Sequence, residues 1–262
     1  MSTTLSELRQ DIGREMQECM VVAITSAATG SFVSTELQSS IGDDRLLQNG
    51  YVKLGGESLR IASYTASTGT VTLDRSLDDV PTGNAEIHTI FPTDEMDDAI
   101  NHTLPRCMYY KTVEIDTSDG ELEYSLAAYT WLARPAQVFR AEWVVGDTDD
   151  EYRYAKTTDW DIYEADNVLT LRLMRTRTDQ LNLVCVSPYA ELAADAGTTD
   201  CPADWVRAGA KTYLYNLKAG LGTNDSTKAM EKQRSKAAAE YDSLTARYSP
   251  RRAPQIRSPR WF

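Results

Sequence analysis

The side chains that could do chemistry in this chain are few and scattered. Its 262 residues include two histidines, His88 in a β-prone run and His102 in a helical one. Neither has a His, Cys or acid beside it at the spacing of metal ligands, so we expect both to have structural roles. The four cysteines, at positions 19, 107, 185 and 201, show no paired spacing, which is typical of small buried side chains.

One acidic segment begins like a calcium-binding loop. Asp147, Asp149 and Glu151 occupy its first three ligand positions, but Tyr152 stands where the turn glycine belongs and Thr158 where the bidentate glutamate belongs. We therefore predict a solvated loop.

No complete motif for a nucleotide or a nucleophile is present. The run Gly220-Leu221-Gly222 begins like a dinucleotide fingerprint, but it follows a helical segment, and Asp225 takes the place of the third glycine. We predict a protein that is not an enzyme and that uses no cofactor and no metal. A hydrolase with two acidic side chains stays an alternative, because a sequence alone cannot pair carboxylates.

The last fourteen residues differ from the rest of the chain in charge and composition. They hold three prolines, no acid, and the residues that we predict to bind a partner: Arg251, Arg252, Arg257, Arg260, Trp261 and Phe262. The prolines prevent a helix from continuing, so we predict an extended arm that spans about 45 Å at roughly 3.3 Å per residue. Large aromatic side chains gain free energy mainly in apolar pockets, so we expect the arm to insert into another subunit. A disordered end that aids solubility is the alternative.

The remainder of the chain is acidic. The 39 acidic residues exceed the 27 basic ones, and without the four arginines of the arm the net charge of residues 1–248 is about −16. Such a surface repels phosphate backbones, so we expect DNA to pass it without specific binding. No apolar run suits a bilayer span and no signal peptide is recognisable, so we expect synthesis in the cytosol and no membrane association.

Apolar spacing predicts four helices. Thr4 and Glu7 form a capping box before a helix that runs to about residue 18. Thr93 is the predicted cap of a second helix, which Pro105 limits. The third helix follows Pro202, has Gly220 as its C-terminal cap, and has a face made of Trp205, Gly209, Thr212, Tyr213, Asn216 and Leu217. The last helix is capped within 224–226 and has a stripe made of Met230, Ala237, Tyr241, Leu244 and Tyr248.

Short β-prone runs lie between the helices. VVAIT, YVKL, RIASYT, TVTL and EIHTIF indicate a small antiparallel unit over 28–91. Further strands are predicted at 137–145, 152–155, 168–174 and 181–187. KTVEID and ELEYSL flank the turn at 117–120 and predict a hairpin.

We predict an α+β fold, in which helices that are distant in sequence bury their apolar faces against one another. It is a four-helix bundle with two antiparallel β insertions and an extended C-terminal arm. The bundle comprises 1–27, 92–110 and 202–248. The small β insertion is 28–91, the larger β-rich region is 111–201, and the basic arm is 249–262.

This order of elements resembles the head-to-tail connector, or adaptor, proteins of tailed bacteriophages. The matching residues are T-L-S-E-L-R in the first helix, the run G-Y-V-K-L-G-G-E-S-L-R-I-A-S-Y-T-A-S-T-G-T-V-T-L-D-R over 50–75, the junction I-F-P-T-D-E-M-D-D-A-I-N-H-T-L over 90–104, and the terminal Y-S-P-R-R-A-P…R-W-F. The likeness in organisation covers nearly the whole chain, although the region 111–200 is larger than we would expect of a minimal connector.

The resemblance implies a structural protein of the virion neck, made in the host cytoplasm, that forms a ring of about twelve copies beneath the portal. The arm would thread into the portal protein, neighbouring copies would meet side to side, and a downstream tail or neck protein would bind below. DNA would pass through the ring in a channel. The alternative function is a carbohydrate- or receptor-binding tail component, which the aromatic-rich region 111–200 suggests.

Overall fold

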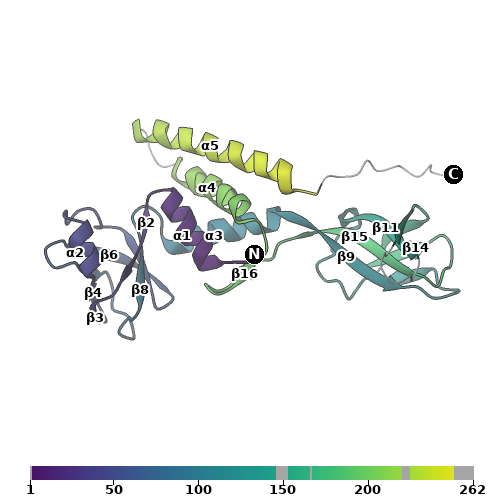
Figure 1. The fold of residues 1–262 in the computed structure, drawn as a ribbon, viewed down its shortest axis with the longest axis horizontal. Coiled ribbons are helices and arrows are strands. Elements are labelled where there is room, and N and C mark those ends of the chain that lie inside the picture. The colour runs from purple at the N-terminus through teal and green to yellow at the C-terminus, as the bar shows by residue number, and fades with distance from the viewer. Residues whose placement is uncertain (1, 146–152, 166, 220–224, 251–262) are drawn as a thin grey trace. The chain divides into compact units, whose positions relative to one another are not determined.

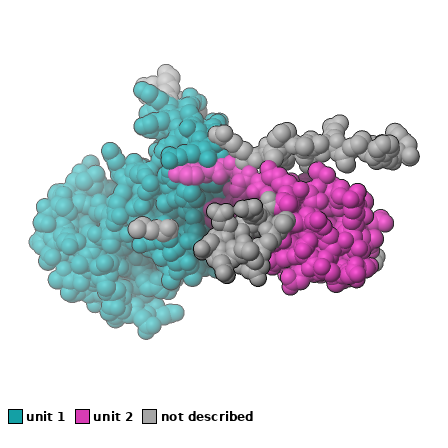
Figure 2. Space-filling view, turned by 45° about the vertical axis from the view of Figure 1, so that its right-hand side comes forward, with its two compact units in different colours: residues 1–107, 190–247 teal, residues 108–189, 248–262 magenta. Residues whose placement is uncertain are grey.

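The computed structural model describes residues 2–145, 153–165, 167–219 and 225–250. Within these ranges the chain forms five α-helices and four sheets, the largest of seven strands (Figure 1). The fold is mostly β, so the predicted four-helix bundle with two antiparallel β insertions is wrong. Contacts divide the chain into two compact units, Met1–Cys107 with Ala190–Arg247 and Met108–Tyr189 with Tyr248–Phe262 (Figure 2).

The prediction failed because strands that are far apart in sequence pair with one another. The sheet of unit 1 has the order β2-β8-β5-β6-β7-β4-β3. Its strands are β2 (Cys19–Ala23), β3 (Ser26–Ala28), β4 (Ser31–Val33), β5 (Tyr51–Leu54), β6 (Glu57–Thr65), β7 (Thr70–Leu73) and β8 (Asn84–His88). Cys19 lies opposite His88, so β2, which follows the first helix, pairs with β8, which precedes the helix that begins at Thr93. The sheet is thus a central element of unit 1 and not an insertion into a helical bundle.

A hydrophobic core lies against this sheet. It includes Phe32, Ile61, Val71 and Ile87, all fully buried, and Leu37 from the short helix α2 (Thr35–Ser40). Position 69 requires a glycine for a steric reason. Its φ is +66°, and a Cβ there would lie 2.2 Å from the carbonyl oxygen of Ser34, so only glycine fits.

Besides α2, the helices of unit 1 are α1 (Leu5–Glu15), α3 (Thr93–Thr103), α4 (Ala203–Ala219) and α5 (Asp225–Tyr248). The capping box of Thr4 and Glu7 is confirmed. The helix predicted near Thr93 is present as α3, but Thr93 is its first residue and not its cap, because Pro92 takes the cap position and no side chain caps the helix. A short 3-10 turn, η1 (Leu104–Arg106), follows α3, and β1 (Thr3–Thr4) pairs with β16 (Thr198–Thr199). None of the helices within the described ranges is long and apolar enough to cross a membrane.

The buried side of α4 matches the predicted face only in part. Trp205 and Gly209 of that face are buried, but Leu217 is 41% exposed, and the buried Val206, Ala210 and Leu214 were not predicted. The helix packs against both α1 and α3, so its buried surface is wider than one stripe. The predicted cap of α4, Gly220, lies outside the described residues.

The stripe of α5 is confirmed. Among the side chains described in this helix only Ala237 is buried, and Met230, Tyr241, Leu244 and Tyr248 are half-buried. The indole N–H of Trp205 donates to Thr245 Oγ1 at 2.9 Å, which ties α5 to α4. Most of the remaining described side chains of α5 face solvent.

Unit 2 contains two antiparallel sheets that share one hydrophobic core. The four-stranded sheet has the order β12-β11-β15-β9, with β12 (Arg153–Thr157), β11 (Val138–Val145), β15 (Gln180–Pro188) and β9 (Met108–Asp116). A 3-10 turn, η2 (Pro135–Gln137), precedes β11. The three-stranded sheet has the order β10-β14-β13, with β10 (Glu123–Ser125), β14 (Val168–Leu173) and β13 (Trp160–Ala165). Core residues such as Val113, Trp143, Leu171 and Leu183 come from both sheets.

The predicted hairpin across 117–120 is wrong. β9 pairs with β15, and β10 pairs with β14, so the turn carries the chain from one sheet to the other. Thr117 holds the turn, because its hydroxyl proton is shared between the carbonyl oxygens of Arg177 and Asp179, which lie 2.7 and 2.5 Å from the hydroxyl oxygen. Strand β13 was not predicted, because acids at Asp161 and Glu164 interrupt its apolar pattern.

Candidate functional site

Several segments singled out in the sequence lie outside the described residues. They are the arm with Arg251, Arg252, Arg257, Arg260, Trp261 and Phe262, the acidic loop with Asp147, Asp149 and Glu151, and the run 220–222. His102 is described, and its ring lies 4.5 Å from that of Tyr213, a packing contact consistent with a structural role.

A buried arginine links four parts of unit 1. Arg9 of α1 is 1% exposed, and its Nε and Nη2 donate to the two carboxylate oxygens of Glu86 at 2.6 and 3.0 Å. Its Nη1 donates to Asp97 of α3 at 2.6 Å and to Asp195 at 2.9 Å. Lys53 of β5 contacts the same two aspartates at 3.1 and 2.9 Å. Two cations therefore face three carboxylates.

The network keeps its members charged. Burial acts to raise the pKa of Glu86, but hydrogen bonds from His88 and Arg9 lower this pKa to about 2. Burial also acts to lower the pKa of Arg9, and Glu86 and Asp97 more than compensate, so this pKa is raised. Each of these charged groups has an opposite charge at hydrogen-bond distance, which suits a structural cross-link.

His88 belongs to the same network, which corrects the expectation that no acid stands near it. Its Nε2 lies 2.9 Å from Glu86 Oε1. Residues i and i+2 of a strand share a face, so the spacing of Glu86 and His88 on β8 was the sequence signal that could have revealed this contact. Gly13 lets α1 approach β2 closely, since a Cβ at position 13 would lie 2.3 Å from the Cβ of Cys19.

Cys19, Glu86 and His88 bring three metal-ligand atoms within 4.8 Å of one another. Their chemistry fits a metal poorly. Burial and the nearby Glu86 raise the pKa of the Cys19 thiol to about 12, whereas a metal needs the thiolate. Both oxygens of Glu86 already accept from Arg9. The cluster is better explained as part of the structural network.

Glu18 is a buried carboxylate beside this network. Its Oε2 accepts the backbone N–H groups of Ile90 and Phe91 at 3.1 and 3.0 Å, and its Oε1 has no hydrogen-bond partner among the described residues. Burial raises its pKa to about 7, although His88 and the two N–H groups act to lower it. Glu18 therefore titrates near neutral pH.

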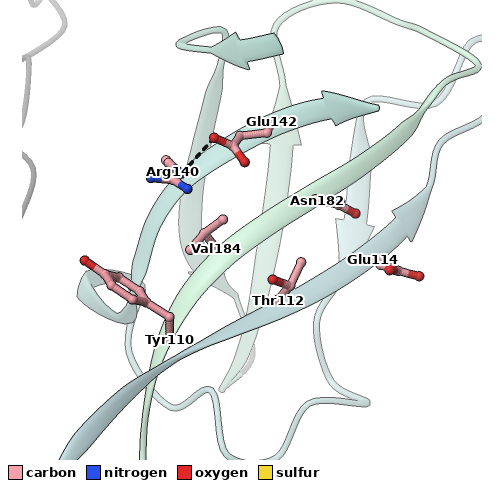
Figure 3. A pocket seen from close by; sticks show the side chains of 7 residues that line it. All are labelled: Tyr110, Thr112, Glu114, Arg140, Glu142, Asn182 and Val184. Atoms are coloured by element: carbon pink, nitrogen blue, oxygen red, sulfur yellow. Dashed lines mark ion pairs between the residues drawn. The ribbon is translucent and has the colours of Figure 1, made fainter. Parts of the chain in front are cut away.

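Unit 2 carries a polar hollow of about 480 Å³ on its four-stranded sheet (Figure 3). Leu181 and Leu183 of β15 face the core, so Asn182 and Val184 between and beyond them face the hollow. The strand register places the hollow's side chains in rows. One row is Glu142, Asn182 and Glu114, and the next is Arg140, Val184 and Thr112, with Tyr110 beyond it.

The floor of this hollow is unusually buried for the outer face of a sheet. Asn182 is 5% exposed and Glu142 is 8% exposed. Arg140 Nε pairs with Glu142 Oε1 at 2.8 Å, and Gln180 donates to Glu114 at 3.3 Å. Asn182 Oδ1 has no hydrogen-bond partner among the described residues. The floor of the hollow thus includes a residue with a covered amide oxygen that the described fold does not satisfy.

The sequence matches no family model, and the search of curated proteins finds no significant match. The two sites are therefore interpreted from their own chemistry. The charged groups of the unit 1 network pair with one another, whereas the hollow of unit 2 combines carboxylates, an amide, a guanidinium and a half-exposed tyrosine.

Proposed function

We propose that this protein is a structural virion component, a head-to-tail connector that forms a ring below the portal and joins the capsid to the tail. The observation that carries the proposal is the arm at 249–262, with its prolines, its four arginines and its terminal Trp261-Phe262 pair. The arm follows directly on α5, which ends at Tyr248.

The arm has the composition of an anchor. Buried aromatic and arginine contacts at an interface are commonly worth about 2 kcal/mol or more each. A ring repeats such a contact in every copy, so even a modest contact becomes strong through avidity. The portal protein is the partner that we propose for the arm, as the resemblance to phage connectors implies.

Two features of unit 1 support a scaffold role. The described part of α5 is 24 residues long and mostly exposed, so it offers surface for a neighbouring copy in a ring. The Arg9 network fastens α1 to β5, β8 and α3, so that these elements resist separation under load. The acidic composition of residues 1–248 favours passage of DNA without binding.

The test compares the full chain with three variants in binding to purified portal-bearing capsids. One variant ends at residue 248, one carries W261A and F262A, and a control carries Arg172→Gln, a change in a surface arginine whose side chain is 57% exposed. We expect the first two to lose co-sedimentation by more than tenfold and the control to bind normally, because only the arm enters the portal.

Electron micrographs of the mixtures should show a ring below the portal with the full chain and no ring with the truncated variant. Circular dichroism should show that every variant is folded. Undiminished attachment of the truncated, folded chain would contradict the proposal.

A further inference from the structure

We propose that the hollow on the four-stranded sheet of unit 2 is a binding site for a neutral, hydroxyl-rich ligand, a saccharide. The side chains that would contact the ligand are Tyr110, Thr112, Glu114, Arg140, Glu142 and Asn182 (Figure 3). This inference goes beyond the connector function and does not depend on it, because it rests only on residues of unit 2.

Hydrogen-bond acceptors dominate one row of the hollow. Glu142 and Glu114 lie on either side of Asn182, on the strands that flank β15. The oxygen of the Asn182 amide lacks a donor although the residue is 95% buried, and leaving a buried acceptor unpaired costs free energy. The oxygen is covered, so a ligand hydroxyl can donate to it only after the amide rotates toward the hollow.

Donors lie in the adjacent row. Arg140 extends its guanidinium to Glu142 at 2.8 Å through Nε, and a guanidinium has further N–H groups. Thr112 lies on β9 opposite Val184 and adds a hydroxyl to this row. The hollow therefore presents acceptors and donors within two cross-strand rows, at the interstrand spacing of about 4.8 Å.

This mixture selects the class of ligand. A cation would use the acceptors but would be repelled by Arg140, and an anion would meet two glutamate side chains. A neutral polyol uses both kinds of group, because each hydroxyl donates one hydrogen bond and accepts others.

Tyr110 provides the apolar part of such a site. Its side chain stands at one end of the hollow, its residue is 47% exposed, and its ring meets Phe139 edge-on at 5.6 Å. An aromatic ring held in this way can pack against the C–H face of a sugar. The volume of about 480 Å³ lies within the range of small-molecule sites.

The test uses saturation-transfer difference NMR on the full chain. The probes are D-galactose, N-acetyl-D-glucosamine, L-rhamnose and maltohexaose, with putrescine as a cationic and citrate as an anionic comparison. We expect saturation transfer to at least one saccharide. A signal from monosaccharides indicates a site for a single ring, and a signal from maltohexaose alone indicates a site for a polymer.

Variants then locate the site. Glu142→Gln and Asn182→Ala should each lower the affinity for the saccharide that binds by about tenfold, since a hydrogen bond to a charged or buried group is worth about that factor. Tyr110→Ala should weaken it as well, which gives a second measurement if Asn182→Ala unfolds the protein. Glu123→Gln is the matched control, because Glu123 lies on the other sheet of unit 2 and its side chain is 52% exposed.

Three results would overturn the proposal. They are silence with all four saccharides, binding that survives both Glu142→Gln and Tyr110→Ala, and binding of putrescine or citrate in place of the saccharides.

Discussion

The Arg9 network of unit 1 and the hollow of unit 2 differ in how far their charged and polar groups are paired. In unit 1, Arg9 and Lys53 meet Glu86, Asp97 and Asp195 at hydrogen-bond distances. In unit 2, the outer row of the four-stranded sheet leaves an amide oxygen without a described partner, beside an ion pair that is partly open to water.

This difference separates groups that hold a fold together from groups that can serve a ligand. Buried charges that pair with several opposite charges hold one another in place, and removing one partner leaves the others buried and unpaired. Polar groups that are only partly satisfied in a hollow have hydrogen-bonding capacity left for a ligand. We therefore assign stability to the network of unit 1 and recognition to the hollow of unit 2.

Arg9→Met gives the largest effect that this comparison predicts. The change removes the cation that faces three carboxylates, so we expect the free energy of unfolding to fall by about 3–5 kcal/mol. Denaturant unfolding followed by circular dichroism measures it. Arg14→Met is the matched control on the same helix, because the Arg14 side chain is 57% exposed and we expect a change within about 0.5 kcal/mol.

An equal, small effect of both substitutions would break the comparison. It would mean that the contacts of Arg9 add no more than those of a solvent-exposed arginine.

Glu18→Gln tests a member of unit 1 whose carboxylate has no arginine or lysine at salt-bridge distance among the described residues. Burial raises the pKa of Glu18 to about 7 from an unfolded value of 4.5, so the folded state holds the proton more tightly. Its contribution to stability is present below about pH 4.5 and is lost as pH rises through 7. Glutamine keeps the acceptor for Ile90 and Phe91 and cannot ionise.

The variant should therefore gain stability relative to the natural chain, on the order of 2–3 kcal/mol, as pH is raised from 5 to 8. Thermal unfolding over this range measures the difference. A difference that stays constant with pH would show that Glu18 has an ordinary pKa in the folded state.

The sequence predicted local structure better than pairing. The capping box of Thr4 and Glu7, the helix near Thr93 and the stripe of α5 depend on neighbours within a few residues, and all were predicted. The fold class was not, because β2 pairs with β8 and β9 pairs with β15, and a period of two residues does not say which strand lies alongside.

The sites show the same limit. Arg9 and Asp195 are 186 residues apart, and Glu114 and Asn182 meet only through the register of β9 and β15. No spacing in a single sequence encodes such contacts. Glu86 and His88 are the exception, because two residues on one strand at i and i+2 must share a face.

Arg140→Met is the counterpart of Arg9→Met in unit 2 and gives the smallest effect. Arg140 pairs with one carboxylate, Glu142, and its side chain is 44% exposed, so water can replace much of the lost contact. We expect the free energy of unfolding to change by about 1 kcal/mol or less, with saccharide binding weakened in the NMR assay. A loss of stability as large as that of Arg9→Met would make the Arg140 pair structural and erase the distinction between the two units. A small loss of stability together with weaker binding would place Arg140 among the groups that serve the ligand.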